Sequence, residues 1–346
     1  MGRKLLWASL VLAPVTIAVD RLTDAGEVTL FVLAAISLIP LAWLIGESTE
    51  HAAEHTGPGI GGFLNASFGN APELIVALVA VGANLPVVVL GSLAGSVISN
   101  LLLVYGVTQM AGPDGARIDR RSLLVQLGLV GVAIVAFAFP TALGHTGAPQ
   151  RHAVVVASVP VAILLLLVYL AVVGRNLQRH RKRERDEPRE GTWRLATALV
   201  VLAVATAATA WVSEILVHSL HAFATAVGLS EFFISIVVVA IVGNAAEHGG
   251  AVVIARKGKM RLASEIAISS SAQVALLVVP VVTLASLLFT HQLGLAFRWS
   301  ELFAMAGSAV VATAVVWDGR SSRREGAFLV VTYAAAVIGF YLGGGR

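Results

Sequence analysis

Two copies of one short pattern, Gly-Asn-Ala-x-Glu, carry the residues best suited to chemistry in this chain. Each copy places an amide and a carboxylate three positions apart, so both side chains lie on one face if the segment is helical. Carboxylate, amide and carbonyl oxygens are the ligands that Ca²⁺ prefers. With no cysteine in the chain, such donors favour Ca²⁺, Mg²⁺ or Mn²⁺ over softer metals. The pairs are Asn70 with Glu73 in FGNAPELIVAL at 68–78, and Asn244 with Glu247 in VGNAAEHGGAV at 242–252, 174 residues later.

The residues around the first pair favour an opening in the backbone. Gly69 and Gly243 permit the close approach of another segment or a local break. Pro72 has no N–H, so the carbonyl of Phe68, four residues earlier, loses its helical partner and becomes a candidate metal ligand. The second copy has Ala246 in the place of Pro72, so its backbone need not open in the same way.

Composition indicates that these acidic residues lie in a membrane. Apolar residues make up 57% of the 346 residues and charged residues only 13%, whereas a soluble domain typically has about 25% charged residues. Runs of roughly 20 apolar residues predict spanning helices and are too long for barrel strands. We therefore predict an all-α integral membrane protein with eleven transmembrane helices, at about 4–20, 27–50, 59–83, 86–111, 121–142, 151–174, 193–220, 228–256, 262–289, 297–317 and 326–344.

The basic residues provide an independent test of this span count. With the N-terminus in the cytoplasm, the cytoplasmic connections hold 20 of the 24 lysine and arginine residues. The other connections hold the remaining four, Arg21, Arg151, Arg298 and Arg346. A wrong count would mix the two sets, so the positive-inside rule supports eleven spans with the N-terminus inside and the C-terminus outside. We expect a multi-pass protein of a cell membrane.

The order of features along the chain predicts an inverted repeat. The two signatures fall in the third and eighth spans, and an odd separation of five spans makes the copies run in opposite directions. Each signature is followed by a small and hydroxylic run, GSLAGSVISN at 91–100 and SEIAISSSAQ at 264–273. In such transporters the binding site lies near the midplane, where the repeats meet. The predicted divisions are an extra N-terminal helix in 1–26, a five-helix repeat in 27–174, a cytoplasmic linker in 175–191 and a second five-helix repeat in 192–346.

The environment of the two glutamates predicts what they bind. A carboxylate at the bilayer centre costs roughly 2.5–3.5 kcal/mol or more and therefore usually has a functional partner. No lysine or arginine lies in mid-span to pair with Glu73 or Glu247. Desolvation and like-charge repulsion both favour the protonated form of a carboxyl group. The pair is therefore expected to hold either protons or a divalent cation, and a protein that alternates between these states is an exchanger.

Further polar residues are candidates for the ion pathway or for secondary roles. His248 follows Glu247 and titrates near neutrality, although it points about 100° away on a helix. Gln273 is the favoured pathway residue of the hydroxylic runs, whereas helix packing explains the individual serines equally well. Glu50 and Glu214 lie nearer span ends, as gates, proton acceptors or wetted interfacial residues. Glu47, His51, Glu54 and His55 lie beside Glu50 without matching the zinc motif H-E-x-x-H. The candidates are Glu50, Glu214, His248, Gln273, Ser96, Ser99 and Ser270, with Asn100, Ser269 and Ser271 as weaker members.

These motifs identify a family resemblance. The segments NASFGNAPELIVAL, GSLAGSVISNLLLVYG and IVGNAAEHGGAVVIARKGKM closely resemble the calcium/cation–proton exchangers, the proton-coupled branch of the calcium/cation antiporter superfamily. The resemblance covers about residues 27 to 344. It implies one extra helix plus two inverted sets of five, a central calcium site at Glu73 and Glu247 with Asn70 and Asn244, and support from Glu50, Glu214 and Gln273. Pro72 stands where family members commonly have threonine.

Two alternatives remain open for the transport reaction. A sodium/calcium exchanger of the same fold would use a sodium gradient in place of a pH gradient. A channel for divalent cations would need a continuous polar pore, and the inverted repeat favours alternating access instead. An enzyme is not expected, because paired aspartate and H-E-x-x-H motifs are missing. We expect no cofactor, no nucleic-acid partner and, as partners, only the transported Ca²⁺, protons and the lipid bilayer.

Overall fold

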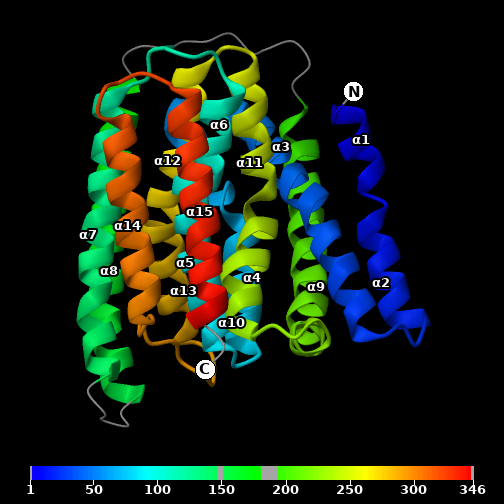
Figure 1. Ribbon diagram of the computed structural model, residues 1–346. Helices are drawn as coiled ribbons and strands as arrows, with labels where there is room; N and C mark the ends of the chain where they lie inside the picture. The colour runs from blue at the N-terminus through cyan, green and yellow to red at the C-terminus, as the bar shows by residue number, and fades with distance from the viewer. Residues whose placement is uncertain (1, 146–150, 181–192, 344–346) are drawn as a thin grey trace.

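The protein is an all-helical bundle in the computed structural model, which describes residues 2–145, 151–180 and 193–343. Within these ranges the chain forms helices and no strand, apart from one isolated bridge between Arg117 and Arg320. The predicted all-α architecture is therefore confirmed. The long helices lie side by side, and the two chain ends lie at opposite ends of the bundle (Figure 1).

The described residues of the first half form nine helical elements, one of which, η1, is π-helical. They are α1 Gly2–Ser9, α2 Leu12–Leu22, α3 Glu27–Phe68, α4 Ala71–Gly82, α5 Pro86–Ser99, η1 Asn100–Val104, α6 Tyr105–Ala111, α7 Arg120–His145 and α8 Arg151–His180. Helix α8 continues to His180, within the predicted linker at 175–191. Residues 181–191 of this linker lie outside the described residues.

Residues 193–343, the described part of the second half, form nine further elements, with two π-helical segments. They are α9 Leu195–Val227, α10 Glu231–Phe233, η2 Ile234–Val239, α11 Ala240–Arg256, α12 Met260–Gln273, η3 Val274–Val278, α13 Val279–Ser286, α14 Trp299–Val316 and α15 Arg323–Gly343. Helices α5, η1 and α6 form one continuous apolar span, as do α12, η3 and α13.

Ten helical segments in the described part of the chain are long and apolar enough to cross a membrane. The predicted span at 59–83 is the exception, because it is divided between the end of α3 and the short helix α4. At 1.5 Å per residue, α4 covers only about 18 Å of a hydrocarbon core of about 30 Å. The connection expected at 51–58 is instead helical. The chain leaves the helix at Gly69 and Asn70, in the middle of the predicted span.

Two of these spans form the interior of the bundle. In Pro86–Ala111, 89% of the most apolar window is buried, and in Met260–Ser286 the value is 72%, whereas the other spans range from 11% to 56%. The other helices therefore expose more apolar surface, as lipid contact requires. The two interior spans are the ones that follow the signatures, so both signatures adjoin the most enclosed part of the protein.

The two interior spans also share a local deviation from α-helical geometry. The π-helical segments η1 and η3 begin at Asn100 and Val274, which are 174 positions apart. The same offset separates Asn70 from Asn244. Such π-helical segments are rare and frequently occur at functional sites. The two interior spans are therefore similar in backbone conformation at this position.

Three basic connections meet at the end of the bundle that carries the N-terminus (Figure 1). Arg117 bridges to Arg320, and Arg261 forms an ion pair with Asp119. The guanidinium of Arg120 lies 4.5 Å from the centre of the Trp317 ring. The connections before α7, α12 and α15 are thus on one side, as the charge distribution predicts. We call this side the basic end.

Candidate cation site

The first signature lies at a break between two helices. Helix α3 ends at Phe68, Asn70 is the N-cap residue of α4, and Pro72 lies in the first turn. Proline is well tolerated there because the first N–H groups of a helix have no internal partner. The opening predicted from Pro72 is therefore present, and the role of the Phe68 carbonyl as a ligand stays a prediction. The second signature lies within the uninterrupted helix α11, as Ala246 in place of Pro72 allows.

Glu73 connects the two signatures in space. Its side chain is only 6% exposed, and a Cβ atom added to Gly243 would lie 3.4 Å from its Cγ atom. The carboxylate of α4 therefore packs against the glycine of the second signature, one turn before Glu247. The two carboxylates also interact electrostatically. The geometry brings both predicted acidic residues to one shared position between α4 and α11.

Each signature asparagine is held by the other half of the chain. Asn70 Nδ2 donates to Gln273 Oε1 at 2.6 Å, and Asn244 Nδ2 donates to Ser96 Oγ at 2.7 Å. Both asparagines are fully buried. Gln273 and Ser96 lie on the two interior spans, just before their π-helical segments. Asn70 with Gln273 and Asn244 with Ser96 are therefore two predicted pairs that each join the two halves of the chain.

Asn100 is the residue of this network that sequence reasoning placed only among the weaker candidates. Its Nδ2 donates to Asn244 Oδ1 at 3.1 Å and to Ser270 Oγ at 3.0 Å. Its Oδ1 lies 2.9 Å from Nε2 of His248, which fits an imidazole that donates from Nε2. The paired hydroxylic runs at 91–100 and 264–273 were the available signal, because Asn100 ends the first run as Gln273 ends the second.

Four buried acceptor oxygens remain without a hydrogen-bond partner from another described residue. They are Glu73 Oε1, Glu73 Oε2, Glu247 Oε2 and Asn70 Oδ1. Neither glutamate forms an ion pair with lysine or arginine in the described part of the chain. Buried acceptors in native proteins normally have partners, so four in one place call for a donor or a cation. Carboxylate and amide oxygens fit a hard divalent cation.

Comparison with known proteins identifies the family of the chain. The family model "Sodium/calcium exchanger protein" matches residues 27–177 and 197–342. The chain belongs to this family. It is 38% identical over 328 residues to the Ca(2+)/H(+) antiporter ChaA of Bacillus subtilis, covering 90% of this chain and 92% of the relative. It is 33% identical to the vacuolar cation/proton exchanger 1b of rice, Oryza sativa subsp. japonica, covering 92% and 76% of the two chains.

A solved structure shows the same fold. The structure of native YfkE superposes with a TM-score of 0.83 at 35% identity, and the match covers 99% of this chain and all of that chain. The exchanger family consists of transporters, so the expectation that the chain is not an enzyme agrees with its membership. The resemblance to proton-coupled exchangers, predicted from the signatures, is likewise confirmed.

Several predicted residues of this exchanger lie outside the hydrogen-bonded network. Glu50 and Glu214 are both exposed on the protein surface. Glu214 lines a pocket of about 600 Å³ together with Trp211, His218 and the C-terminal part of α4. Ser99 bonds back to the carbonyl of Ser96 in its own helix at 3.3 Å. Glu214 is therefore near the signature helix, whereas Ser99 has only a local bond.

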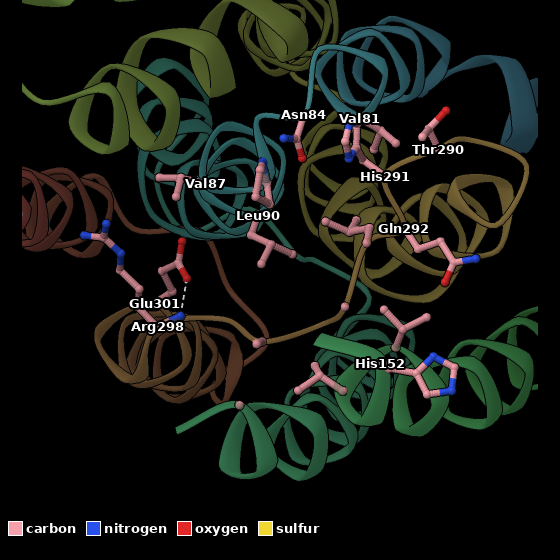
Figure 2. A pocket seen from close by; sticks show the side chains of 17 residues that line it. Val81, Asn84, Val87, Leu90, His152, Thr290, His291, Gln292, Arg298 and Glu301 are labelled. Atoms are coloured by element: carbon pink, nitrogen blue, oxygen red, sulfur yellow. Dashed lines mark hydrogen bonds between the residues drawn. The ribbon is translucent and has the colours of Figure 1, made fainter. Parts of the chain in front are cut away.

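A second pocket, of about 750 Å³, opens at the end opposite the basic end. It is lined by the connection before α14 and by the ends of α4, α5 and α8, with Asn84, His152 and His291 among its side chains (Figure 2). Glu301 caps α14 by accepting a bond from the N–H of Arg298. The pocket contains none of the signature residues, so it is separate from the candidate cation site.

The histidine-rich segment of α3 does not form a metal site. His51 lies 3.5 Å from Glu47 and 4.0 Å from Glu54, and its ring stacks on Trp193 at 4.5 Å between centroids. His55 lies 2.6 Å from the carbonyl oxygen of Trp193. Among the described residues, no group of three or more histidine, aspartate or glutamate side chains has metal-binding geometry. The segment instead packs α3 against the beginning of the second half.

Proposed function

We propose that this chain exchanges Ca²⁺ for protons across the membrane, with Glu73 and Glu247 binding the cation and the protons in turn. The observation that carries the proposal is the set of four buried acceptor oxygens, three of them on these glutamates, that lack a partner. Ca²⁺ supplies two positive charges to two carboxylates, and two protons do the same. Either occupant removes the cost of buried, uncompensated charge.

Relatives support the choice of ions. The bacterial relative is named a Ca(2+)/H(+) antiporter, and the rice relative is named a cation/proton exchanger. Both are similar to this chain over about nine-tenths of its length. Among the residues that the structure describes, no lysine or arginine is ion-paired with either glutamate, which leaves the proton as the available alternative to the metal. These two lines of support are independent of each other.

The hydrogen bonds suggest how the site distinguishes Ca²⁺ from smaller cations. Asn70 and Asn244 are fixed by Gln273 and Ser96 from opposite halves, while Asn70 Oδ1 stays free to coordinate. The Phe68 carbonyl at the helix break is a further oxygen donor in this proposal. A site that offers several oxygen ligands, some rigid and some flexible, suits Ca²⁺. Mg²⁺ demands a stricter octahedral geometry and usually keeps several of its bound water molecules.

Alternating access follows in this proposal from an inverted repeat of spans two to six against seven to eleven, with α1 and α2 as the extra N-terminal span. The matched π-helical segments and the reciprocal asparagine contacts support it. Glu247 is half-buried and Gly249 and Gly250 are exposed. The two glycines lie between Glu247 and Arg256, toward the basic end. We propose that the site is open to the basic end, which is cytoplasmic, and that Glu214 lies on the route from the other side.

Calcium uptake into proteoliposomes tests the function. Purified protein is reconstituted, and ⁴⁵Ca²⁺ uptake is measured with an outward proton gradient or an outward sodium gradient imposed separately. We expect the proton gradient to drive uptake and the sodium gradient to have no effect. Glu73→Gln and Glu247→Gln should each abolish uptake, whereas Glu27→Gln, at an exposed helix start, should not.

The same assay distinguishes the alternatives. Uptake driven by sodium alone would indicate a sodium/calcium exchanger. Uptake that dissipates the calcium gradient without coupled proton movement would indicate a channel. Normal proton-driven uptake by either glutamine variant would overturn the assignment of the site, provided that the variant elutes as a single species of wild-type size.

A further inference from the structure

One histidine of α3 lies between two carboxylates and a tryptophan from the second half of the chain. We call His51, Glu47, Glu54 and Trp193 the histidine clasp. The first three lie on one face of α3, because they are three or four positions apart. Trp193 lies two residues before α9. The clasp is at the basic end, where α1 and the beginning of α9 also lie (Figure 1). None of its residues has a role in the proposed exchange.

Both ring nitrogens of His51 face a carboxylate. Nε2 lies 3.5 Å from Glu47 and Nδ1 lies 4.0 Å from Glu54, and neither nitrogen has a hydrogen-bond partner among the described residues. A neutral imidazole donates from one nitrogen only, so its other nitrogen presents a lone pair to a carboxylate oxygen. The protonated ring donates from both nitrogens and fits this position better. Charge-assisted N–H···O bonds are about 2.7–2.9 Å long, so uptake of a proton should draw the ring and the carboxylates together.

The face of the His51 ring lies on Trp193, with 4.5 Å between the ring centroids and 26° between the ring planes. A cation over the face of a tryptophan is attracted by the π electrons of the ring. Trp193 is itself held in place, because its carbonyl oxygen lies 2.6 Å from Nε2 of His55 and its ring lies 6.0 Å from the ring of Trp7 in α1. A proton on His51 therefore strengthens a contact between α3 and the beginning of α9.

His51 is accessible to protons and is the group of the clasp whose charge changes near neutral pH. Its side chain is 15% exposed. Imidazole changes its charge between about pH 5 and 8, whereas exposed glutamate, lysine and arginine keep theirs there. The exposed charged groups of α3 and of the elements packed against it at this end include Glu50, Lys4, Arg175, Arg194 and Arg256. Helices α4 and α11 also pack against α3 and carry Glu73, Glu247 and His248 of the exchange site. A test of the clasp must therefore be separated from protonation of that site.

We propose that the histidine clasp senses the pH at the basic end and slows exchange when that side becomes acidic. Protonated His51 binds Glu47 and Glu54 through its nitrogens and Trp193 through its ring face. The effect on rate rests on the proposed function, in which α3 and α9 begin the two repeats and alternating access moves one repeat against the other. A stronger contact between the repeats stabilises the conformation that contains it, so the chain leaves that conformation more slowly. Since export of Ca²⁺ brings protons into the cytoplasm, the clasp acts as negative feedback.

Tryptophan fluorescence of the purified full-length chain tests proton binding by the clasp. A charged imidazole quenches the emission of a tryptophan that it contacts, so the emission should fall in one step as the pH is lowered from 8 to 5. The step should be absent from His51→Gln and from Trp193→Phe. It should remain in the control His152→Gln, which changes an exposed histidine of the pocket at the opposite end. Constant emission in the wild-type chain, or a step that persists in His51→Gln, would contradict the proposal.

Transport in inverted membrane vesicles, which present the basic end to the medium in the predicted topology, tests the effect on rate. Initial ⁴⁵Ca²⁺ uptake is measured at a constant proton gradient while the pH of the medium is lowered from 8 to 6. Saturating Ca²⁺ is used, because proton competition at the exchange-site glutamates changes the KM for Ca²⁺ and not the maximal rate. The maximal rate of the wild-type chain should fall by about fivefold, the effect of one modest ion pair and one cation–π contact.

Two variants decide the role of the clasp in this assay. His51→Gln, and separately Glu47→Gln combined with Glu54→Gln, should each retain the maximal rate at pH 6, while His152→Gln should behave as the wild-type chain. If one variant does not fold, the other gives the decision. A fall in rate as large as that of the wild-type chain would sink the regulatory role. Absence of proton-driven uptake in the wild-type chain would instead refute the proposed function, and the fluorescence step would still report the proton on His51.

Discussion

At the scale of single residues, the central feature is a pair of buried carboxylates that lack basic partners. The amides around them are used differently. Asn244 is bonded through both its oxygen and its nitrogen, whereas Asn70 keeps its oxygen free. The two halves therefore contribute unequally. The first supplies Glu73, Asn70 and the open backbone at Phe68, while the second supplies Glu247 in an intact helix that His248 connects to Asn100.

Gln273 provides a prediction at this scale. Replacing it with leucine removes the acceptor of Asn70 Nδ2 and leaves that buried donor unpaired. An unpaired buried donor costs about 1–3 kcal/mol, so the apparent KM for Ca²⁺ should rise by roughly tenfold, since about 1.4 kcal/mol corresponds to a factor of ten. The control is Ser269→Ala on the same helix, because Ser269 Oγ bonds only to the Ile266 carbonyl. An unchanged KM for Ca²⁺ in Gln273→Leu would show that the hydrogen bond from Gln273 is not needed to orient Asn70 for Ca²⁺ binding.

At the scale of helices, the interior spans are held by close backbone contacts. A Cβ atom on Gly95 would lie 2.0 Å from the Ile236 carbonyl oxygen, so α5 touches η2 with no room for a side chain. Asn244 Nδ2 donates to the hydroxyl of Ser96, which follows Gly95 in the chain, and to the Ala240 carbonyl. The position of the second signature relative to α5 therefore depends on this contact.

Gly95→Ala should destabilise the protein and reduce proton-driven calcium uptake, because α5 and η2 must separate. Helix propensity alone predicts the opposite, since alanine is favoured over glycine by about 1 kcal/mol in a helix. The matched control is Gly128→Ala in α7, where an added Cβ meets nothing within 4 Å. Melting temperature and uptake should be retained in the control. A Gly95→Ala protein as stable and active as Gly128→Ala would contradict the contact.

At the scale of the whole molecule, topology is the main prediction. The chain ends lie at opposite ends of the bundle, and the basic connections meet at the end with the N-terminus (Figure 1). The positive-inside rule then predicts that the N-terminus and the basic end lie in the cytoplasm. Because the chain contains no cysteine, single cysteines can report on each side without a background.

Lys257→Cys and Thr290→Cys test this topology, since both side chains are exposed at opposite ends. In intact cells, a membrane-impermeant maleimide should label the cysteine at position 290 and spare the one at 257. After permeabilisation, both should react. Labelling of position 257 in intact cells would reverse the orientation, and with it the direction from which the site is open.

Much of the site could be predicted because its residues repeat in the sequence. The offset of 174 identifies Asn70, Glu73, Asn244 and Glu247, and polarity in an apolar span identifies Gln273. The contact of His248 with Asn100 could not be predicted, because it joins two helices whose relative rotation is set by packing. The helical continuation of α3 through His51 also differs from the prediction. There, packing against Trp193 outweighs the polar and glycine-rich local sequence.

The most direct test of the central claim is proton release on calcium binding. Purified protein in weakly buffered detergent solution is titrated with CaCl₂, while bound Ca²⁺ and free protons are measured together. The account predicts that protons leave in proportion to the Ca²⁺ bound, and that Glu73→Gln and Glu247→Gln each lose both signals. Calcium binding without proton release, or undiminished release in both variants, would contradict the assignment of these two glutamates as the shared site.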